Sequence, residues 1–224
     1  MIGCWAVVTT EIEFNFSKQQ PFQVSFTDFP KGEEAAYELD FENGASLPAE
    51  IKSRSQGLRI SGNNHSDDLF MYAYKKVTGL KPNTMYQVDF SLEFASNART
   101  GSVGAGGSPG DCVYVKMGTT THKPARYVDK TNFYQLDLDK GNQGTGGKDL
   151  ILMGTIGVET EALYSLKTLA HQSKVRQATL HNYSLTTNNL GEFWIIFGTD
   201  SGYESTTTIF YTHLLAQLHE IPTQ

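Results

Sequence analysis

The sequence predicts an all-β fold, a two-sheet antiparallel sandwich of the jelly-roll type with at most one short helix. Apolar and polar residues alternate along many short segments, which is the period of strands that bury one face. Gly, Asn and Ser concentrate between these segments, as they do in turns. Tyr and Phe, which favour strands, number 11 and 13, whereas charged residues make up only 19% of the chain.

The clearest alternating segment is 86–94 (YQVDFSLEF), in which Tyr, Val, Phe, Leu and Phe share one face. Segments with apolar residues on both faces are expected to be central strands covered from two sides. The last strand is expected to be long and to close a sheet. The other alternating strands are 12–16, 22–26, 37–41 and 112–117; the two-sided ones are 69–74, 150–158 and 193–197; and 58–61, 179–187 and 206–218 complete the set.

Residues 159–171 (ETEALYSLKTLAH) alone have helical spacing, and a strand through Tyr164 and Leu166 is the alternative. Two long segments, 95–111 and 119–147, are predicted as irregular loops, which at this length are usually functional or mobile. The 224 residues show no repeat and no linker, so we expect one sandwich domain spanning residues 1–224.

Composition and hydropathy argue against nucleic-acid binding and against a transmembrane helix. The chain has 18 basic and 24 acidic residues, a net charge of −6, whereas nucleic-acid-binding proteins usually carry a basic face. No apolar run approaches the roughly 20 residues that a transmembrane helix needs. We therefore expect neither nucleic acid nor a membrane-spanning segment.

The first residues, 1–10 (MIGCWAVVTT), lack the parts of a complete signal peptide. The segment Met1 to Cys4 nevertheless resembles the end of a bacterial lipoprotein signal. If translation starts further upstream, Cys4 would be a lipid anchor and residues 1–10 a tether; the alternative is an accidental match. Cys4 and Cys112 permit one disulfide without demanding it, and no cysteine or histidine cluster suggests zinc.

Several segments resemble an uncharacterised family of bacterial cell-envelope or secreted proteins, some of them described only as lipoproteins. This resemblance implies a location in the cell envelope or outside the cell but no activity. Residues 79–94 (GLKPNTMYQVDFSLEF) are also similar to the turn and strand of galactose-binding-like jelly rolls, which include many carbohydrate-binding modules. The segments similar to the envelope family are 61–72 (SGNNHSDDLFMY), 78–97, 104–118 (GAGGSPGDCVYVKMG), 140–147 and 198–212 (GTDSGYESTTTIFYT).

The polar segment 63–68 (NNHSDD) precedes the apolar strand at residue 69 and is the best candidate for chemistry. Asp67 and Asp68 are predicted calcium ligands, since calcium prefers carboxylate oxygens. Asn63, Asn64 and His65 are predicted to hydrogen-bond sugar hydroxyls. The alternative is a turn whose Asn and Asp side chains satisfy their own backbone.

Asp137 and Asp139 begin a second calcium-like segment, DLDKG. Gly141 and Lys148 occupy positions where an EF-hand needs an acidic or amide residue and a glutamate. The segment is therefore not an EF-hand, and a calcium-binding turn of another kind, with Asp137 and Asp139 as ligands, is the prediction that stays open.

No complete catalytic motif is present. Residues 142–148 (NQGTGGK) lack the first glycine of a P-loop, and Asp149 stands where Ser or Thr must hold magnesium. Ser201 follows Asp200 as in serine proteases, but Thr199 replaces the expected glycine and no histidine motif precedes it.

These observations predict a non-catalytic domain that binds carbohydrate or another polar ligand at the bacterial surface. Calcium is predicted to support this binding. Asp111, Asp200, Tyr203 and Glu204 are further predicted contacts, provided that their loops share one end of the sandwich. One alternative is a jelly-roll enzyme, a glycosidase or lyase, which requires two converging carboxylates. Another is a structural envelope protein with a flat apolar patch.

Overall fold

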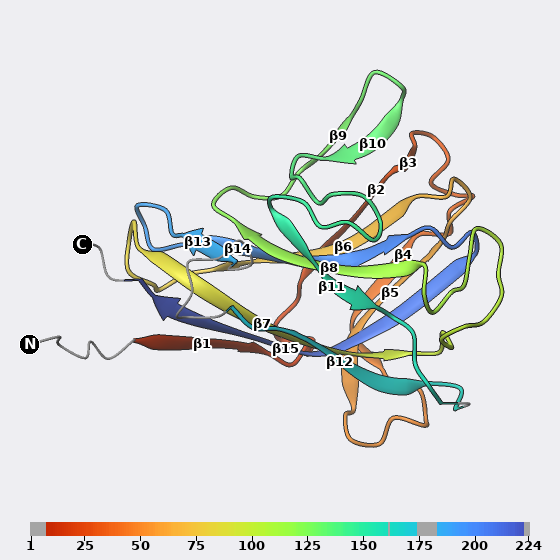
Figure 1. Ribbon diagram of the computed structural model, residues 1–224, viewed down its shortest axis with the longest axis horizontal. Helices are drawn as coiled ribbons and strands as arrows, with labels where there is room; N and C mark the ends of the chain where they lie inside the picture. The colour runs from red at the N-terminus through yellow and green to blue at the C-terminus, as the bar shows by residue number, and fades with distance from the viewer. Residues whose placement is uncertain (1–7, 161, 174–182, 222–224) are drawn as a thin grey trace, which may run out of the picture.

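The computed structural model describes residues 8–160, 162–173 and 183–221. These residues form two antiparallel sheets that face each other and a smaller third sheet (Figure 1). The predicted all-β sandwich is therefore confirmed. Within these residues no helix is long and apolar enough to cross a membrane. Cys4 lies outside the described residues, so its predicted lipid anchor and disulfide stay predictions.

The five-stranded sheet has the order β11-β8-β14-β6-β2. Its central strand, β14, pairs with β6 on one side and with β8 on the other. The strands are β2 (Gln23–Thr27), β6 (Leu69–Val77), β8 (Val113–Thr120), β11 (Leu150–Thr155) and β14 (Phe193–Ser201).

The seven-stranded sheet has the order β12-β7-β15-β5-β4, with β1 pairing with β15 and β13 with β7. The last strand was expected to close a sheet; it lies instead between β7 and β5, because its 15 residues pair along both edges. The strands are β1 (Thr9–Phe14), β4 (Asp40–Ser46), β5 (Gln56–Asn63), β7 (Met85–Ser96), β12 (Ser165–His171), β13 (Ser184–Thr186) and β15 (Thr206–Glu220).

The core lies between the two sheets and contains one face of each alternating strand. Phe197 of β14 packs against Tyr211 of β15, with ring centroids 4.8 Å apart, so this contact joins the two sheets. Phe16 packs against Phe197 at 5.5 Å. The inward residues of the alternating pattern are therefore the ones that hold the sandwich together.

The outer face of the five-stranded sheet is covered as well, as the two-sided apolar pattern of 69–74 and 193–197 predicted. Phe70, Tyr72 and Ile196 pack under Leu136 and Leu138. These two leucines come from the chain around the small sheet, which is formed by β3 (Phe29–Pro30), β10 (Phe133–Leu136) and β9 (Arg126–Val128). In Figure 1 the β9–β10 hairpin lies beyond the five-stranded sheet, away from the seven-stranded one.

One open alternative is decided, and two local predictions were wrong. Residues 165–171 form strand β12, the strand alternative for this segment, and pair with β7 over seven positions. Residues 119–147 are not wholly irregular, since they contain β9 and β10. Residues 150–155 form β11, an edge strand rather than a central one. Of the predicted strand 179–187, residues 179–182 lie outside the described residues, and Ser184–Thr186 forms β13.

Candidate functional site

The polar loops singled out from the sequence meet at one end of the sandwich. The turn after β14 is bonded to the glycine-rich loop, because Glu204 N donates to Ala105 O at 2.9 Å and Gly202 N donates to Cys112 O at 2.9 Å. The loop before β6 joins them through Asn64, whose Nδ2 donates to the carbonyl oxygens of Ser201 and Tyr203. The condition attached to the predicted binding site, that these loops share one end, is therefore met.

A pocket of about 270 Å³ opens between two of these loops and the start of β15. We call it the loop pocket. Tyr203 forms part of its wall, and the packing there is tight: a Cβ on Gly104 would lie 2.4 Å from the Tyr203 ring. The pocket is lined by Asn97, Ala98, Arg99, Ser102, Pro109, Ile156, Tyr203, Thr206, Thr207 and Thr208. It thus presents an aromatic ring together with amide, guanidinium and hydroxyl groups.

Among the other predicted sugar contacts, Asn64 is buried and its amide holds the loops, so it is a structural residue. Asp111 accepts a hydrogen bond from Gly101 N at 2.7 Å and thereby folds its own loop. His65 bonds the carbonyl oxygen of Ala36 at 3.1 Å. Asn63 ends β5, and Glu204 is exposed beside the loop pocket.

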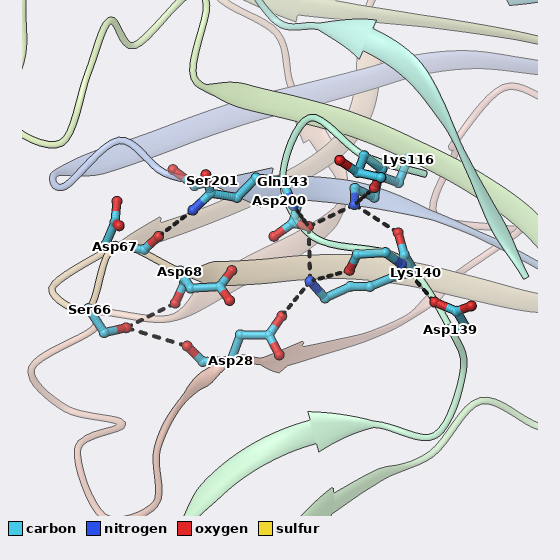
Figure 2. A network of polar contacts seen from close by, with 12 residues as sticks. Asp28, Ser66, Asp67, Asp68, Lys116, Asp139, Lys140, Gln143, Asp200 and Ser201 are labelled. Carbon is cyan, nitrogen blue, oxygen red and sulfur yellow. Dashed lines mark hydrogen bonds and ion pairs between the residues drawn. The ribbon is translucent and has the colours of Figure 1, made fainter. Parts of the chain in front are cut away.

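A second polar centre lies on the outer face of the five-stranded sheet (Figure 2). The carboxyl groups of Asp28, Asp68 and Asp200 each place an oxygen within 4.8 Å of the others. Two lysines neutralise them. Lys140 Nζ lies 3.0 Å from Asp28 Oδ2 and 2.9 Å from Asp200 Oδ2, and Lys116 Nζ lies 3.0 Å from Asp200 Oδ2. We call these five residues the Asp–Lys cluster.

Strand geometry places Asp200 and Lys116 on this outer face, because their neighbours Thr199 and Val115 alternate to the other side. Both side chains are fully buried, at 0% exposure. The loop that joins β10 to β11, residues 137–149, covers them: Lys116 Nζ donates to Lys140 O at 2.7 Å and to Thr145 O at 2.8 Å.

The cluster has no net charge when one carboxyl is protonated. Burial and the neighbouring carboxylates of Asp200 and Asp28 raise the pKa of Asp68 to about 8. Burial works to raise the pKa of Asp200 too, but Lys140 and Lys116 outweigh it and lower that pKa. At neutral pH, protonated Asp68 therefore leaves two carboxylates facing two ammonium groups, an arrangement that avoids an uncompensated buried charge.

This assignment predicts a pH-dependent stability. The pKa of Asp68 is higher in the folded chain than unfolded, so the folded state binds the extra proton and unfolding free energy falls as pH rises from about 4 to about 8. The slope is at most about 1.4 kcal/mol per pH unit. Asp68→Asn, which stays neutral, should flatten it. Urea unfolding of both proteins across this range checks the prediction, and equal slopes would contradict it.

The remaining residues predicted to bind metal stabilise their own loops. Asp139 accepts hydrogen bonds from Gly141 N and Lys148 N. Asp137 accepts one from Ala125 N, and the carbonyl oxygen of Asp67 accepts one from the Gln143 side chain. The carboxylates that do converge hold the Lys140 ammonium, which supplies the positive charge that a metal ion would otherwise bring.

Sequence reasoning missed Asp28 and Lys116 and gave Lys140 no role. Asp28 adopts φ 67° where the chain passes from β2 to β3. Lys116 occupies the polar phase of an alternating strand, which normally faces water. No local signal marked it: its partner on β14 is Gly198, where a side chain would meet the backbone of β6 rather than open space.

No protein-family model matches the chain, and no curated protein matches it, so the resemblance to the bacterial envelope family finds no support there. The chain is similar to several solved carbohydrate-binding modules. They include a mannan-recognising module, TmCBM27 (8% identity, TM-score 0.40, 97% of this chain and 100% of that one).

A xylan-binding domain from Paenibacillus barcinonensis is similar over 95% of both chains, at 9% identity and a TM-score of 0.38. A third module, TmCBM61, was solved with β-1,4-galactotriose; it is 9% identical, with a TM-score of 0.36, over 90% of this chain and 97% of that one. At these identities and TM-scores, the similarities carry no argument about fold or ligand.

Proposed function

We propose that the protein is a non-catalytic carbohydrate-binding domain that binds an extracellular polysaccharide in the loop pocket. The observation that carries the proposal is the convergence of Tyr203 with polar side chains in one pocket of about 270 Å³. Ligand pockets typically pair apolar or aromatic walls with a few polar groups that fix orientation.

The chemistry of the lining suits a sugar ring. One face of a pyranose presents C–H groups, which pack against an aromatic face such as that of Tyr203, while its hydroxyls both donate and accept hydrogen bonds. Asn97 and the hydroxyls of Thr206 and Thr208 can do the same, and Arg99 is a donor. Because no carboxylate is found among the described residues that line the pocket, we propose a neutral or acidic polysaccharide as ligand.

The proposal gives calcium no role. The Asp–Lys cluster is compensated by its own lysines, and the buried side chains of Asp200 and Lys116 act in the packing of the loop above them.

Calorimetric titration against a set of soluble plant and bacterial polysaccharides tests the proposal. We expect saturable binding to at least one of them, unaffected by a calcium chelator. An absence of binding to every polysaccharide would overturn it.

A further inference from the structure

The Asp–Lys cluster has a feature that charge compensation alone does not require. The two carboxylate oxygens of Asp200 differ in their hydrogen-bond partners. Oδ2 faces three donors: Lys140 Nζ at 2.9 Å, Lys116 Nζ at 3.0 Å and Gln143 N at 2.9 Å. Oδ1 is buried and has no hydrogen-bond partner among the residues that the structure describes, and neither has Asp68 Oδ1. One side of the carboxyl group is thus crowded with donors while the other faces a second carboxyl.

The surroundings exclude water from the carboxyl group and leave the amine at the edge of a small pocket, where the Lys140 side chain is 10% exposed. Asp200 and Lys116 are fully buried. The Lys140 ammonium lies 5.3 Å from the centroid of the Phe70 ring, and Phe70 is itself buried with Leu138 and other apolar residues in the outer cluster. A site that holds two reactants in contact and excludes water favours condensation over hydrolysis.

We propose that Lys140 and Asp200 condense spontaneously to an intramolecular isopeptide bond. The Nζ–Cγ bond forms, a Cγ–O bond of Asp200 breaks, and one water leaves. The ammonium gives up two protons and the carboxylate oxygen gains two, so no oxidant or other co-reactant is needed. The proposal is independent of carbohydrate binding.

The neighbouring groups can each carry part of this reaction. Asp28 Oδ2, 3.0 Å from Lys140 Nζ, takes the first proton and leaves a neutral amine in a transient step. Burial raises the pKa of Asp28, which favours this transfer. Burial also works to lower the pKa of Lys140, but Asp200, Asp28 and Asp68 outweigh it and raise that pKa, so the ammonium is the resting form. Lys116 Nζ and Gln143 N stay on Oδ2 and stabilise the negative charge that develops there. Asp68, protonated at neutral pH, gives its proton to the departing Oδ1.

The proton balance closes. Asp28 passes its acquired proton to the departing oxygen, which then leaves as water, and Asp68 recovers a proton from the nitrogen. The cluster is neutral before and after the reaction, because the Lys116 ammonium and the Asp28 carboxylate remain charged in the product. A pocket of about 300 Å³ lined by Asp28, Asp68 and Lys140 gives the water a way out.

The bond would tie the loop between β10 and β11 to the central strand β14, across 60 positions of sequence. It would thus fix the covering of the outer sheet face covalently, much as a disulfide constrains an unfolded chain.

Intact-mass spectrometry of the purified, denatured wild-type chain tests the proposal. The expected mass is lower than the sequence mass by one water, and proteolysis should yield a branched peptide joining Lys140 to Asp200. Lys140→Arg keeps the charge but cannot form this amide, so it should have the full sequence mass. Lys148→Arg, at an exposed lysine of the same loop, should keep the deficit.

Asp68→Asn removes the acid and should leave most of the chain uncondensed. A wild-type chain with its full sequence mass after prolonged incubation would overturn the proposal, whatever the variants do. A deficit that persists in Lys140→Arg would also overturn it, because that result would indicate dehydration elsewhere, such as a succinimide.

Discussion

In a Lys140→Arg background, where no amide can form, Asp200→Ala is expected to lower the free energy of unfolding by about 3–5 kcal/mol, the range for breaking a buried ion pair by removing one partner. Asp200 is the only carboxylate within 4.0 Å of Lys116 among the described residues, and both side chains are fully buried. The variant therefore leaves the buried Lys116 ammonium without a carboxylate in direct contact, and it removes an acceptor from Gln143 N.

Urea denaturation measures this loss, and Asp40→Ala is its matched control. Asp40 also pairs with a cation, Arg59, at 2.6 Å, but its side chain is 60% exposed. Exposed pairs contribute about 0–1 kcal/mol, so the control should lose no more than that. Equal losses in the two variants would show that the Asp–Lys cluster adds no stability beyond that of a surface pair.

Tyr203→Ala is expected to weaken polysaccharide binding about tenfold or more, because Tyr203 is the one aromatic residue among the described residues that line the loop pocket. A tenfold loss corresponds to about 1.4 kcal/mol, less than full burial of a large apolar side chain provides. Tyr203→Phe keeps the ring and should retain most of the affinity. Calorimetric titration of each variant measures the change.

Tyr127→Ala is the control for this variant. Tyr127 is 52% exposed on β9 and does not line the loop pocket, so its loss should leave the affinity unchanged. Because Tyr203 also packs against the core, thermal unfolding of Tyr203→Ala must show a folded protein at the titration temperature. A folded Tyr203→Ala with wild-type affinity would exclude the loop pocket as the binding site.

The fold class followed from the sequence because strand alternation is a local property. The pattern of 86–94 assigns each residue of β7 to a face without any knowledge of its neighbours. The spacing of 159–171 left helix and strand open for the opposite reason: pairing with β7 is a long-range interaction, and it outweighs local preference.

The candidate site could be predicted only in part. Turn-forming composition marked the loops around Asn64 and Tyr203, and the structure brings these loops together. Lys116 could not be recognised, because a lysine in the polar phase of a strand is normally solvated. Its burial depends on carbonyl oxygens 24 and 29 positions later in the chain, which no local pattern encodes.

The most direct test of carbohydrate binding in the loop pocket is an NMR titration. An oligosaccharide that binds is added to the isotope-labelled protein, and the changes in amide chemical shifts are recorded. We predict that the largest shifts occur at Asn97, Arg99, Tyr203 and Thr206–Thr208. Shifts confined to another face, such as the outer face of the seven-stranded sheet, or no shifts at all, would contradict the account.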